Sequence, residues 1–485
     1  MAKLDGLEPK IVWSTFEEIT KIPRCSGKEK GIQTWLEQWA HGNGLDFKKD
    51  EVGNILITRR ATTGCEGNPV LVLQSHQDMV CEKNSDSAHN FETDEIPIKL
   101  DGNTVKSEGT SLGADNGIGL AISLAMLIDT SLKRHGKIEA LTTVEEETGL
   151  KGALNMKPGF FTGKYMINLD SEEAGVVIIG SAGGSGTQYN FLFTQEPMVG
   201  WTGYRVEING LLGGHSGVDI HLPRANANKL IADFLAHLRK KTLVRLVQIE
   251  GGTRGNAIPR SASCNLIIPS SYVDKIDDIF ATWTARVKTK YPAEAGIRVT
   301  LSVNPASTAL TTDQTDSIIG LINDVHNGVF SWSKSIEGLV ETSNNLGVIT
   351  TMNNSIKINI LSRSSDIEDL RKDLKILSDV GIKYSAEVTQ SPPSQGWKAD
   401  VNSPLLKTVA SIYESVRGEK PKMTAVHGGL ECGHFTRLNP GLSVLSIGPT
   451  IKYPHSPQEY VYIDSVNIVW AVVRKLAEKM GNESK

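Results

Sequence analysis

The chain has 485 residues, of which 39% are hydrophobic and 22% are charged, and its formal net charge is −4. This length exceeds what one hydrophobic core usually supports, so we expect about two or three domains. The ordinary composition and a pI of about 6.3 give no sign of a basic surface, which argues against nucleic acid as a partner. No apolar run approaches the roughly 20 residues of a membrane-spanning helix, and the N-terminus lacks the apolar centre of a signal peptide.

The five cysteines are scattered along the chain, and no two of them form a Cys-x-x-Cys pair. An odd number with this spacing is typical of reduced thiols, so we expect a cytoplasmic protein that does not bind membranes. Cys81 and Cys432 lie close in sequence to the motifs described below. Each is more often a core residue than a nucleophile, so a thiol hydrolase that uses one of them is a distant third hypothesis, behind those described below.

The first part of the chain alternates strand-like and helix-like segments, which predicts an α/β sheet flanked by helices. Residues 116–129 are rich in Ala, Leu and Ile and are predicted to form a helix that packs against this sheet. A glycine-rich break follows at residues 180–186. Because the composition changes after this break, we predict a domain boundary there.

Residues 185–391 differ in character, because strand-like stretches such as 297–303 are mixed with amphipathic helices. The clearest helix is predicted over residues 223–240, where apolar side chains recur at helical spacing. Pro223 suits the first turn of this helix. The apolar stripe indicates packing in a core rather than a cofactor site.

Residues 391–396 contain two prolines, two serines and a glycine and are predicted to be a return linker. The α/β character resumes after this linker. The chain is expected to close with a helix that Asp464 caps and Gly481 ends.

Three consecutive glutamates, Glu145, Glu146 and Glu147, follow the apolar run 138–144. If this run is a strand that leads into a loop, the carboxylates lie at its carboxyl end, where open α/β sheets bind their ligands. Carboxylates this close together repel one another unless a cation neutralises them. An isolated triplet would more often be a solvated charge cluster, but other segments share its layout.

Four further segments combine apolar strands with residues that commonly bind metals. They contribute His76 with Asp78, then Asp115, Asp170 and His455. Oxygen and imidazole ligands without a nearby thiolate favour a catalytic zinc, manganese or cobalt site over a structural zinc site. The sequence therefore predicts that distant segments converge on one metal site.

A single site of this kind requires the first and last parts of the chain to form one domain. We predict a discontinuous α/β catalytic domain over residues 1–184 and 392–485, with a sheet flanked by helices and two metal ions. Residues 185–391 are then an inserted α+β domain, which can act as a lid over the site and in dimerisation.

The motifs resemble those of the M20 family of co-catalytic metallopeptidases, and they span both predicted domains. The matching stretches are residues 74–80, 112–119, 168–173, 213–217, 255–260, 429–433 and 446–450. This resemblance implies two divalent metal ions per chain, zinc in the first place and manganese or cobalt as alternatives. One ion would be held by His76, Asp115 and Asp170. The other would be held by Asp115, Glu147 and His455, so that Asp115 bridges the two.

The family pattern Glu-Glu-x-Gly matches this chain through Gly149, which separates the roles of the three glutamates. Glu146 would be the general base, Glu147 a metal ligand, and Glu145 a bystander. Asp78 would orient the imidazole two positions before it. A carboxylate that binds no metal is needed to take a proton from water and pass it to the leaving nitrogen.

The predicted insertion contributes residues that resemble the family's substrate-binding groups. His215 would stabilise the tetrahedral oxyanion, and Asn256 would contact the region of the substrate carbonyl. Arg363 would bind the C-terminal carboxylate of the peptide, a task that suits the bidentate geometry of a guanidinium. Without the resemblance, a turn His, a loop Asn and a surface Arg would be the more frequent interpretations.

Together these expectations describe a metal-dependent dipeptidase of broad specificity, which forms a homodimer and hydrolyses unblocked dipeptides, including those that end in histidine. A water shared by the two ions and activated by Glu146 would attack the peptide bond. Two alternatives stay open. One is an amino-acid deacylase of the same family, and the other is a non-catalytic metal-binding module with the same fold.

Overall fold

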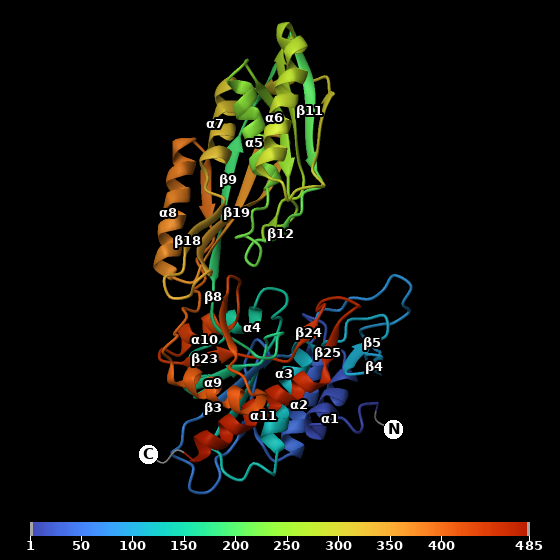
Figure 1. Cartoon of the computed structure of the whole chain (residues 1–485), viewed down its shortest axis with the longest axis vertical. Helices are drawn as coiled ribbons and strands as arrows, with labels where there is room; N and C mark the ends of the chain where they lie inside the picture. The colour runs from blue at the N-terminus through green and yellow to red at the C-terminus, as the bar shows by residue number, and fades with distance from the viewer. Residues whose placement is uncertain (1–2, 483–485) are drawn as a thin grey trace. The chain divides into compact units, whose positions relative to one another are not determined.

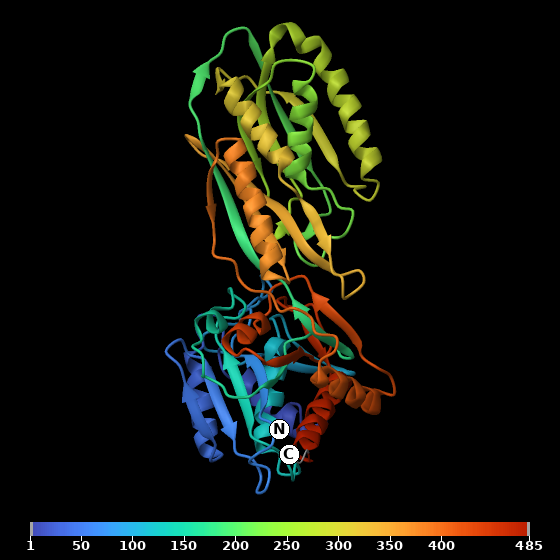
Figure 2. The same ribbon diagram turned by 90° about the vertical axis from the view of Figure 1, so that its left-hand side faces the viewer.

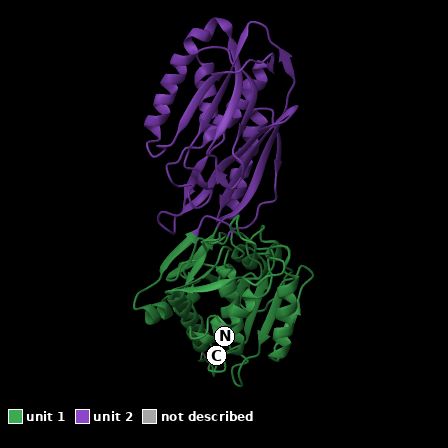
Figure 3. Cartoon of the chain, turned by 90° about the vertical axis from the view of Figure 1, so that its right-hand side faces the viewer, with its two compact units in different colours: residues 1–181, 397–425, 430–485 green, residues 182–396, 426–429 purple. Residues whose placement is uncertain are grey.

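The structure is a computed structural model and describes residues 3–482. The chain divides into two compact units, which are coloured separately in Figure 3. Unit 1 contains residues 1–181, 397–425 and 430–485, and unit 2 contains residues 182–396 and 426–429. The chain therefore enters unit 2 twice, once for a long stretch and once for four residues that the predicted boundaries assign to the other domain.

The main sheet of unit 1 has the strand order β1-β2-β6-β3-β7-β23-β8-β22, and Figure 1 shows several of these strands. Neighbouring strands β6, β3, β7 and β23 run parallel, so their carboxyl ends lie at one edge. All six residues of β3 and of β6 are buried, as expected for a parallel sheet covered on both faces. The strand bounds are Asp46–Lys49 (β1), Ile55–Arg59 (β2), Leu71–His76 (β3), Ile138–Thr143 (β6), Tyr165–Asn168 (β7), Val176–Ser181 (β8), Lys422–Val426 (β22) and Ser443–Ser446 (β23).

Helices pack on and around this sheet. Helix α3 contacts β3 and β6, and α11 contacts both α3 and α9. Most of α3 is buried, which explains why it is apolar almost all round. The helix bounds are Lys10–Thr20 (α1), Lys30–Gly42 (α2), Ala114–Ile128 (α3), Lys151–Asn155 (α4), Pro404–Arg417 (α9), Cys432–Leu438 (α10) and Ile463–Asn482 (α11).

The predicted helix over residues 116–129 is confirmed as α3, and the predicted closing helix is confirmed as α11. The predicted ends of α11 are wrong. Asp464 lies inside its first turn rather than at the N-cap, and its carboxylate accepts a hydrogen bond from Asn103. The helix continues through Gly481 to the last described residue, because tertiary packing on Gly481 overrides its low helix propensity.

A small antiparallel sheet in unit 1 has the order β24-β25-β5-β4, and Figure 1 shows its four strands side by side. It places the loop at residues 453–459 next to the chain that leads into α3. The strands are Ile98–Asp101 (β4), Thr104–Ser107 (β5), Ile451–Lys452 (β24) and Tyr460–Tyr462 (β25).

Unit 2 is built on an antiparallel sheet with the order β16-β11-β15-β13-β19-β20-β9-β21, and β18 pairs with β19. Its long strands and its helices are visible in Figure 2. The strands are Gly183–Leu192 (β9), Trp201–Asn209 (β11), Arg245–Gly251 (β13), Ala262–Pro269 (β15), Arg298–Val303 (β16), Gly328–Trp332 (β18), Val340–Thr351 (β19), Ser355–Ser364 (β20) and Glu387–Gln390 (β21). The helices are Ala227–Arg239 (α5), Ile276–Lys290 (α6), Thr312–Asp324 (α7) and Ile367–Lys383 (α8).

Short elements complete unit 2. They are a 3-10 helix over Ser270–Lys275 and the paired strands Gln195–Pro197 (β10) with Thr308–Leu310 (β17) and Gly214–His215 (β12) with Ala257–Ile258 (β14). The strand predicted over residues 297–303 is confirmed as β16. The helix predicted over 223–240 exists, but it begins at Ala227 rather than at Pro223. The side chain of Asn226 accepts hydrogen bonds from the first backbone N–H groups and so fixes this later start.

None of the helices within residues 3–482 is both long and apolar enough to cross a membrane.

Trp283 anchors the core of unit 2. It is fully buried, its ring lies 5.2 Å from that of Phe234, and its Nε1 donates to Asp233 at 2.7 Å. We predict that Trp283→Ala lowers the free energy of unfolding by about 3–5 kcal/mol, because a large cavity replaces the ring. Trp332 is 51% exposed, so Trp332→Ala is the matched control and should change the urea midpoint very little. Equal effects of the two variants would contradict this interpretation.

Candidate metal centre

Three predicted metal ligands meet at the edge where the parallel strands end. His76 is the last residue of β3 and is 1% exposed, and Asp170 follows β7. The Nε2 atom of His76 lies 3.1 Å from Oδ1 of Asp115 and 3.3 Å from Oδ1 of Asp170. One imidazole nitrogen therefore faces two carboxylates that come from different elements.

A second imidazole approaches the same aspartate from the other side. The Nε2 atom of His455 lies 3.1 Å from Oδ2 of Asp115 and 2.9 Å from Oε1 of Glu147. Each oxygen of Asp115 thus faces a different histidine. This arrangement is what a carboxylate that bridges two cations requires, with one oxygen for each.

Glu146 lies in the same cluster. One ligand atom each from His76, Glu146 and Asp170 lie within 4.8 Å of one another, and so do ligand atoms of His76, Asp115 and Glu147. Glu145 is turned elsewhere and forms an ion pair with Lys151. We call the six clustered residues the carboxylate–histidine group: His76, Asp115, Glu146, Glu147, Asp170 and His455.

The charge of the carboxylate–histidine group fits divalent metal ions. Its four carboxylates carry a formal charge of −4 when ionised, which two divalent cations would balance. Burial and the nearby carboxylates raise the pKa of Asp170 to about 6 and that of Glu146 well above its ordinary value. Hydrogen bonds to Asp115 and Glu147 raise the pKa of His455 to about 11. Oxygen and imidazole donors of this kind suit zinc, manganese or cobalt.

Asp78 connects the first imidazole to the glutamates. Its carboxylate is fully buried and lies 3.3 Å from Nδ1 of His76. It also accepts hydrogen bonds from the backbone N–H groups of Glu146 (3.1 Å) and Glu147 (3.3 Å) and from the hydroxyl of Ser26 (2.7 Å). Burial would raise the pKa of Asp78, but these bonds and the charge of His76 lower it to about 2. An ionised Asp78 can therefore fix both the imidazole and the loop after β6.

A buried polar network lies beneath the group. The Glu431 carboxylate accepts hydrogen bonds from Nε2 of Gln74 (2.6 Å) and from the hydroxyl of Thr143 (2.8 Å), and Asn168 donates to Oε1 of Gln74 at 2.5 Å. These bonds join the ends of β6, β3 and β7. Burial raises the pKa of Glu431 to about 8.

The three residues predicted to bind substrate lie together within unit 2. His215, on β12, pairs with the residue after Asn256, and the carbonyl of Asn256 accepts from Ser216 N at 2.9 Å. Arg363, on β20, donates from Nε to Oγ of Ser216 at 3.5 Å. An imidazole, an amide and a guanidinium therefore come from β12, from the residue before β14 and from β20, and Ser216 links them.

His427 adds a residue that the sequence did not assign. It belongs to the four-residue stretch that returns to unit 2, and its Nε2 lies 2.7 Å from Oγ of Ser343. Burial and the charge of Arg363 lower the pKa of His427 to about 3, so this imidazole is neutral near pH 7.

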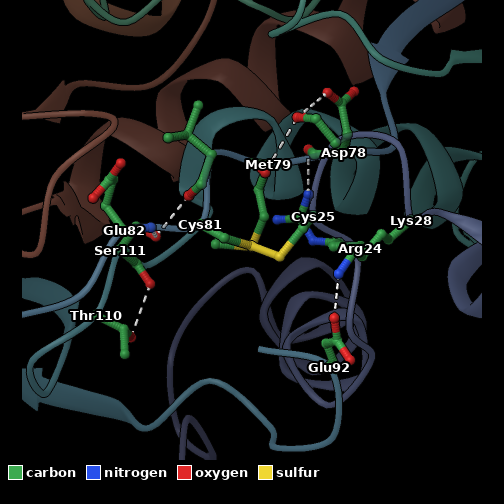
Figure 4. The surroundings of a disulfide bond; sticks show 12 residues. Arg24, Cys25, Lys28, Asp78, Met79, Cys81, Glu82, Glu92, Thr110 and Ser111 are labelled. Carbon is green, nitrogen blue, oxygen red and sulfur yellow. Dashed lines mark hydrogen bonds and ion pairs between the residues drawn. A yellow bond between two sulfur atoms is a disulfide. The ribbon is translucent and has the colours of Figure 1, made fainter. Parts of the chain in front are cut away.

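The structure contradicts the expectation that all cysteines are reduced. Cys25 and Cys81 form a disulfide with a Cα–Cα distance of 5.6 Å (Figure 4). Their separation of 56 residues hides this proximity in the sequence. The two chain segments meet because Cys25 pairs with Met79 in a β-bridge and Arg24 donates to the backbone carbonyls of Gln77 and Asp78.

This pairing also bears on the thiol hydrolase hypothesis. Cys81 has no free thiol while it is bonded to Cys25. Burial raises the pKa of the Cys432 thiol well above its ordinary value, which disfavours the thiolate that nucleophilic attack requires. Neither cysteine is therefore suited to act as a nucleophile.

Comparisons with known proteins identify the family of this chain. Residues 72–479 match the model of peptidase family M20/M25/M40, so the chain belongs to this family of peptidases. It is 38% identical over 485 residues to the cytosol non-specific dipeptidase of Escherichia coli K12, and the alignment covers 99% of each chain.

Solved structures of peptidases superimpose on this chain. An aminoacylhistidine dipeptidase from Vibrio alginolyticus superimposes with a TM-score of 0.91 at 38% identity, covering 98% of both chains. A tripeptidase from Staphylococcus aureus has a TM-score of 0.58 at 17% identity and covers 98% of this chain and 100% of its own, a likeness that shows the fold alone.

Several residues that shape this centre were not found from the sequence. Arg24, Gln74, Asn168 and Glu459 act through hydrogen bonds to backbone or side-chain groups that are distant in the chain. For Gln74 and Asn168 a signal existed, because each lies two positions before a predicted ligand, and Gln74 also shares one side of β3 with His76. For Arg24 and Glu459, which lie in loops, no periodicity was available.

The disulfide gives a direct test. We predict that the oxidised protein, denatured without reductant, contains three reactive thiols per chain, because two of the five cysteines are bonded. Thiol titration before and after reduction measures this number. Cys81→Ser should free one further thiol and lower the free energy of unfolding by about 2–4 kcal/mol. Five thiols without reductant would contradict the pairing.

Proposed function

We propose that this protein is a metal-dependent dipeptidase that hydrolyses unblocked dipeptides of broad specificity, including those that end in histidine. The observation that carries the proposal is the position of Asp115, whose two oxygens face two different imidazoles. The two relatives that match almost the whole chain at 38% identity are both dipeptidases by name. Two divalent ions, zinc first and manganese or cobalt as alternatives, are the proposed cofactors.

In this proposal His76, Asp115 and Asp170 hold one ion, and Asp115, Glu147 and His455 hold the other. Ions bound there would supply Lewis-acid chemistry, which lowers the pKa of water and stabilises negative charge on the peptide oxygen. The protein fold sets the distances between the proposed ligands. Parallel strands fix three of the ligands, and the loop before β25 brings in His455.

Glu146 is proposed as the general base. It takes a proton from the attacking water and delivers it to the leaving nitrogen. Burial raises its pKa above the ordinary value of a carboxyl group, and a carboxylate placed beside the attacking water can accept its proton. Asp78 holds the backbone of Glu146 and the ring of His76 at once, so it positions the base relative to a metal ligand.

The residues of unit 2 are proposed to contact the substrate. Nδ1 of His215 accepts hydrogen bonds from the backbone N–H groups of Gly217 (3.3 Å) and Val218 (3.2 Å), so the neutral ring carries its proton on Nε2. Burial, with the charge of Arg363, lowers the pKa of His215. This tautomer can donate Nε2–H to an oxyanion. Asn256 is proposed to contact the carbonyl region, and Arg363 the C-terminal carboxylate.

We further propose that unit 2 acts as a lid and in dimerisation, that the protein is a homodimer, and that it works in the cytoplasm. The name of the Escherichia coli relative supports the cytoplasmic location. An amino-acid deacylase is the second candidate, because the carboxylate–histidine group would serve amide hydrolysis in either type of substrate.

A substrate panel tests the proposal. After chelation and reloading with zinc, manganese or cobalt, the protein should hydrolyse free dipeptides. C-amidated forms should resist because Arg363 needs a free carboxylate, and N-acetylated forms should resist because the proposed substrates are unblocked. Chelation alone should abolish turnover. Release of free amino acids, followed by chromatography, is the measurement. Hydrolysis of N-acyl amino acids without cleavage of any dipeptide would favour the deacylase.

Two neighbouring substitutions separate the base from the ligand. Glu146→Gln should lower kcat by at least about 100-fold while both metal ions stay bound, because only proton transfer is lost. Glu147→Gln should lower the occupancy of one ion, because a weaker ligand replaces the carboxylate. Elemental analysis of the dialysed proteins gives the metal content of each variant. Normal turnover of Glu146→Gln would refute the base assignment, and full occupancy in Glu147→Gln would refute the ligand assignment.

A further inference from the structure

Glu459 has an unusual environment for an acidic side chain. It lies in the loop between β24 and β25, is only 2% exposed, and has no basic side chain as an ion-pair partner within the described residues. Its carboxylate instead accepts hydrogen bonds from four consecutive backbone N–H groups. These are Leu112 N (2.8 Å) and Gly113 N (2.9 Å) on Oε2, and Ala114 N (2.8 Å) and Asp115 N (3.2 Å) on Oε1.

Four converging N–H groups require two acceptor atoms, each of which can accept two hydrogen bonds. A carboxylate meets this demand, because each of its oxygens accepts two bonds. A glutamine of the same shape would turn its NH₂ group toward two of the N–H groups and leave them without an acceptor. The segment is also tightly packed, because Gly113 has φ +69° and a Cβ there would lie 2.6 Å from Arg24 Nη2.

The loop between β24 and β25 makes two contacts with Asp115. Glu459 binds the backbone N–H of Asp115, and His455, four positions earlier, approaches Oδ2 of its carboxylate at 3.1 Å. His455 has φ +59°, a left-handed conformation that non-glycine residues adopt only when the surroundings hold them there. Pairing of β25 with β5 anchors the end of the loop. The two contacts therefore set both the position and the direction of the Asp115 side chain relative to His455.

We infer that Glu459 is a positioning residue for the metal centre. Glu459 holds Asp115 where the Asp115 carboxylate would bridge the two cations. This inference rests on the proposed two-metal site. Glu459 touches neither the cations nor the substrate in this scheme. It acts by fixing the backbone of the one ligand that both ions share, so its loss weakens both sites together.

A purely structural role is the competing explanation, and the chain offers a matched control. Glu139, at the start of β6, is 1% exposed and accepts hydrogen bonds from Thr162 N (2.8 Å), Thr162 Oγ1 (2.6 Å) and Gly163 N (3.1 Å). It is a buried carboxylate that binds backbone N–H groups, as Glu459 is, and it differs in also forming an ion pair with Lys137 at 2.8 Å. It lies at the opposite end of the strand from Glu146 and Glu147.

The test compares Glu459→Gln with Glu139→Gln in the full-length chain, by titration of the metal-free proteins with zinc and manganese in a calorimeter. We expect Glu459→Gln to weaken the binding of both ions by roughly 10- to 100-fold and excess metal to restore its turnover. Glu139→Gln should bind both ions as the unsubstituted protein does, even if its thermal unfolding temperature falls. Glu459→Gln with unchanged affinities, or with a defect equal to that of Glu139→Gln, would overturn the inference.

A second variant keeps the test decisive if Glu459→Gln does not fold. Glu459→Asp keeps the charge but is one methylene shorter, so it cannot reach all four N–H groups, and its metal affinity should also fall. Affinity equal to that of the unsubstituted protein would overturn the inference. If the unsubstituted protein itself binds fewer than two ions, the two-metal proposal fails together with the inference. If it binds two and the Glu459 variants do as well, the inference alone fails.

Discussion

The contact on which the centre depends is the sharing of one carboxylate between two imidazoles. Asp115 presents one oxygen to His76 and the other to His455, and three further carboxylates surround it. Like charges at this density repel strongly in a buried site. The arrangement fits a place where cations bind, and the surrounding fold has to hold these groups together against their mutual repulsion.

The fold does this mainly with backbone hydrogen bonds rather than with ion pairs. Asp78 accepts the N–H groups of Glu146 and Glu147, and Glu459 accepts those of residues 112–115. Arg24 donates to the carbonyls of the segments on both sides. Backbone groups cannot rotate away as side chains can, so these contacts hold the proposed ligands in place, which is the benefit of a preorganised site.

The connections of the chain explain why remote segments contribute. The disulfide between Cys25 and Cys81 ties the loop of Arg24 to the chain just after Asp78. The four residues that return to unit 2 carry His427 and end just before Glu431, whose carboxylate joins β3 and β6. A mutation in any of these loops can therefore affect the centre without touching a ligand.

The sequence by itself determined the α/β class, the main helices and the family, because burial imposes a period on strands and helices and because ligand-type residues follow the strands. The sequence also named the six residues that the structure brings together, and their roles in binding metal and in catalysis are proposals. The later start of α5 reflects a local cap at Asn226, whereas tertiary structure alone decided the extension of α11 past Gly481, the Cys25–Cys81 disulfide and the place of Glu459. Each of these last three depends on a hydrogen bond, a bond or a packing contact between residues far apart in the chain, and local periodicity carries no information about such partners.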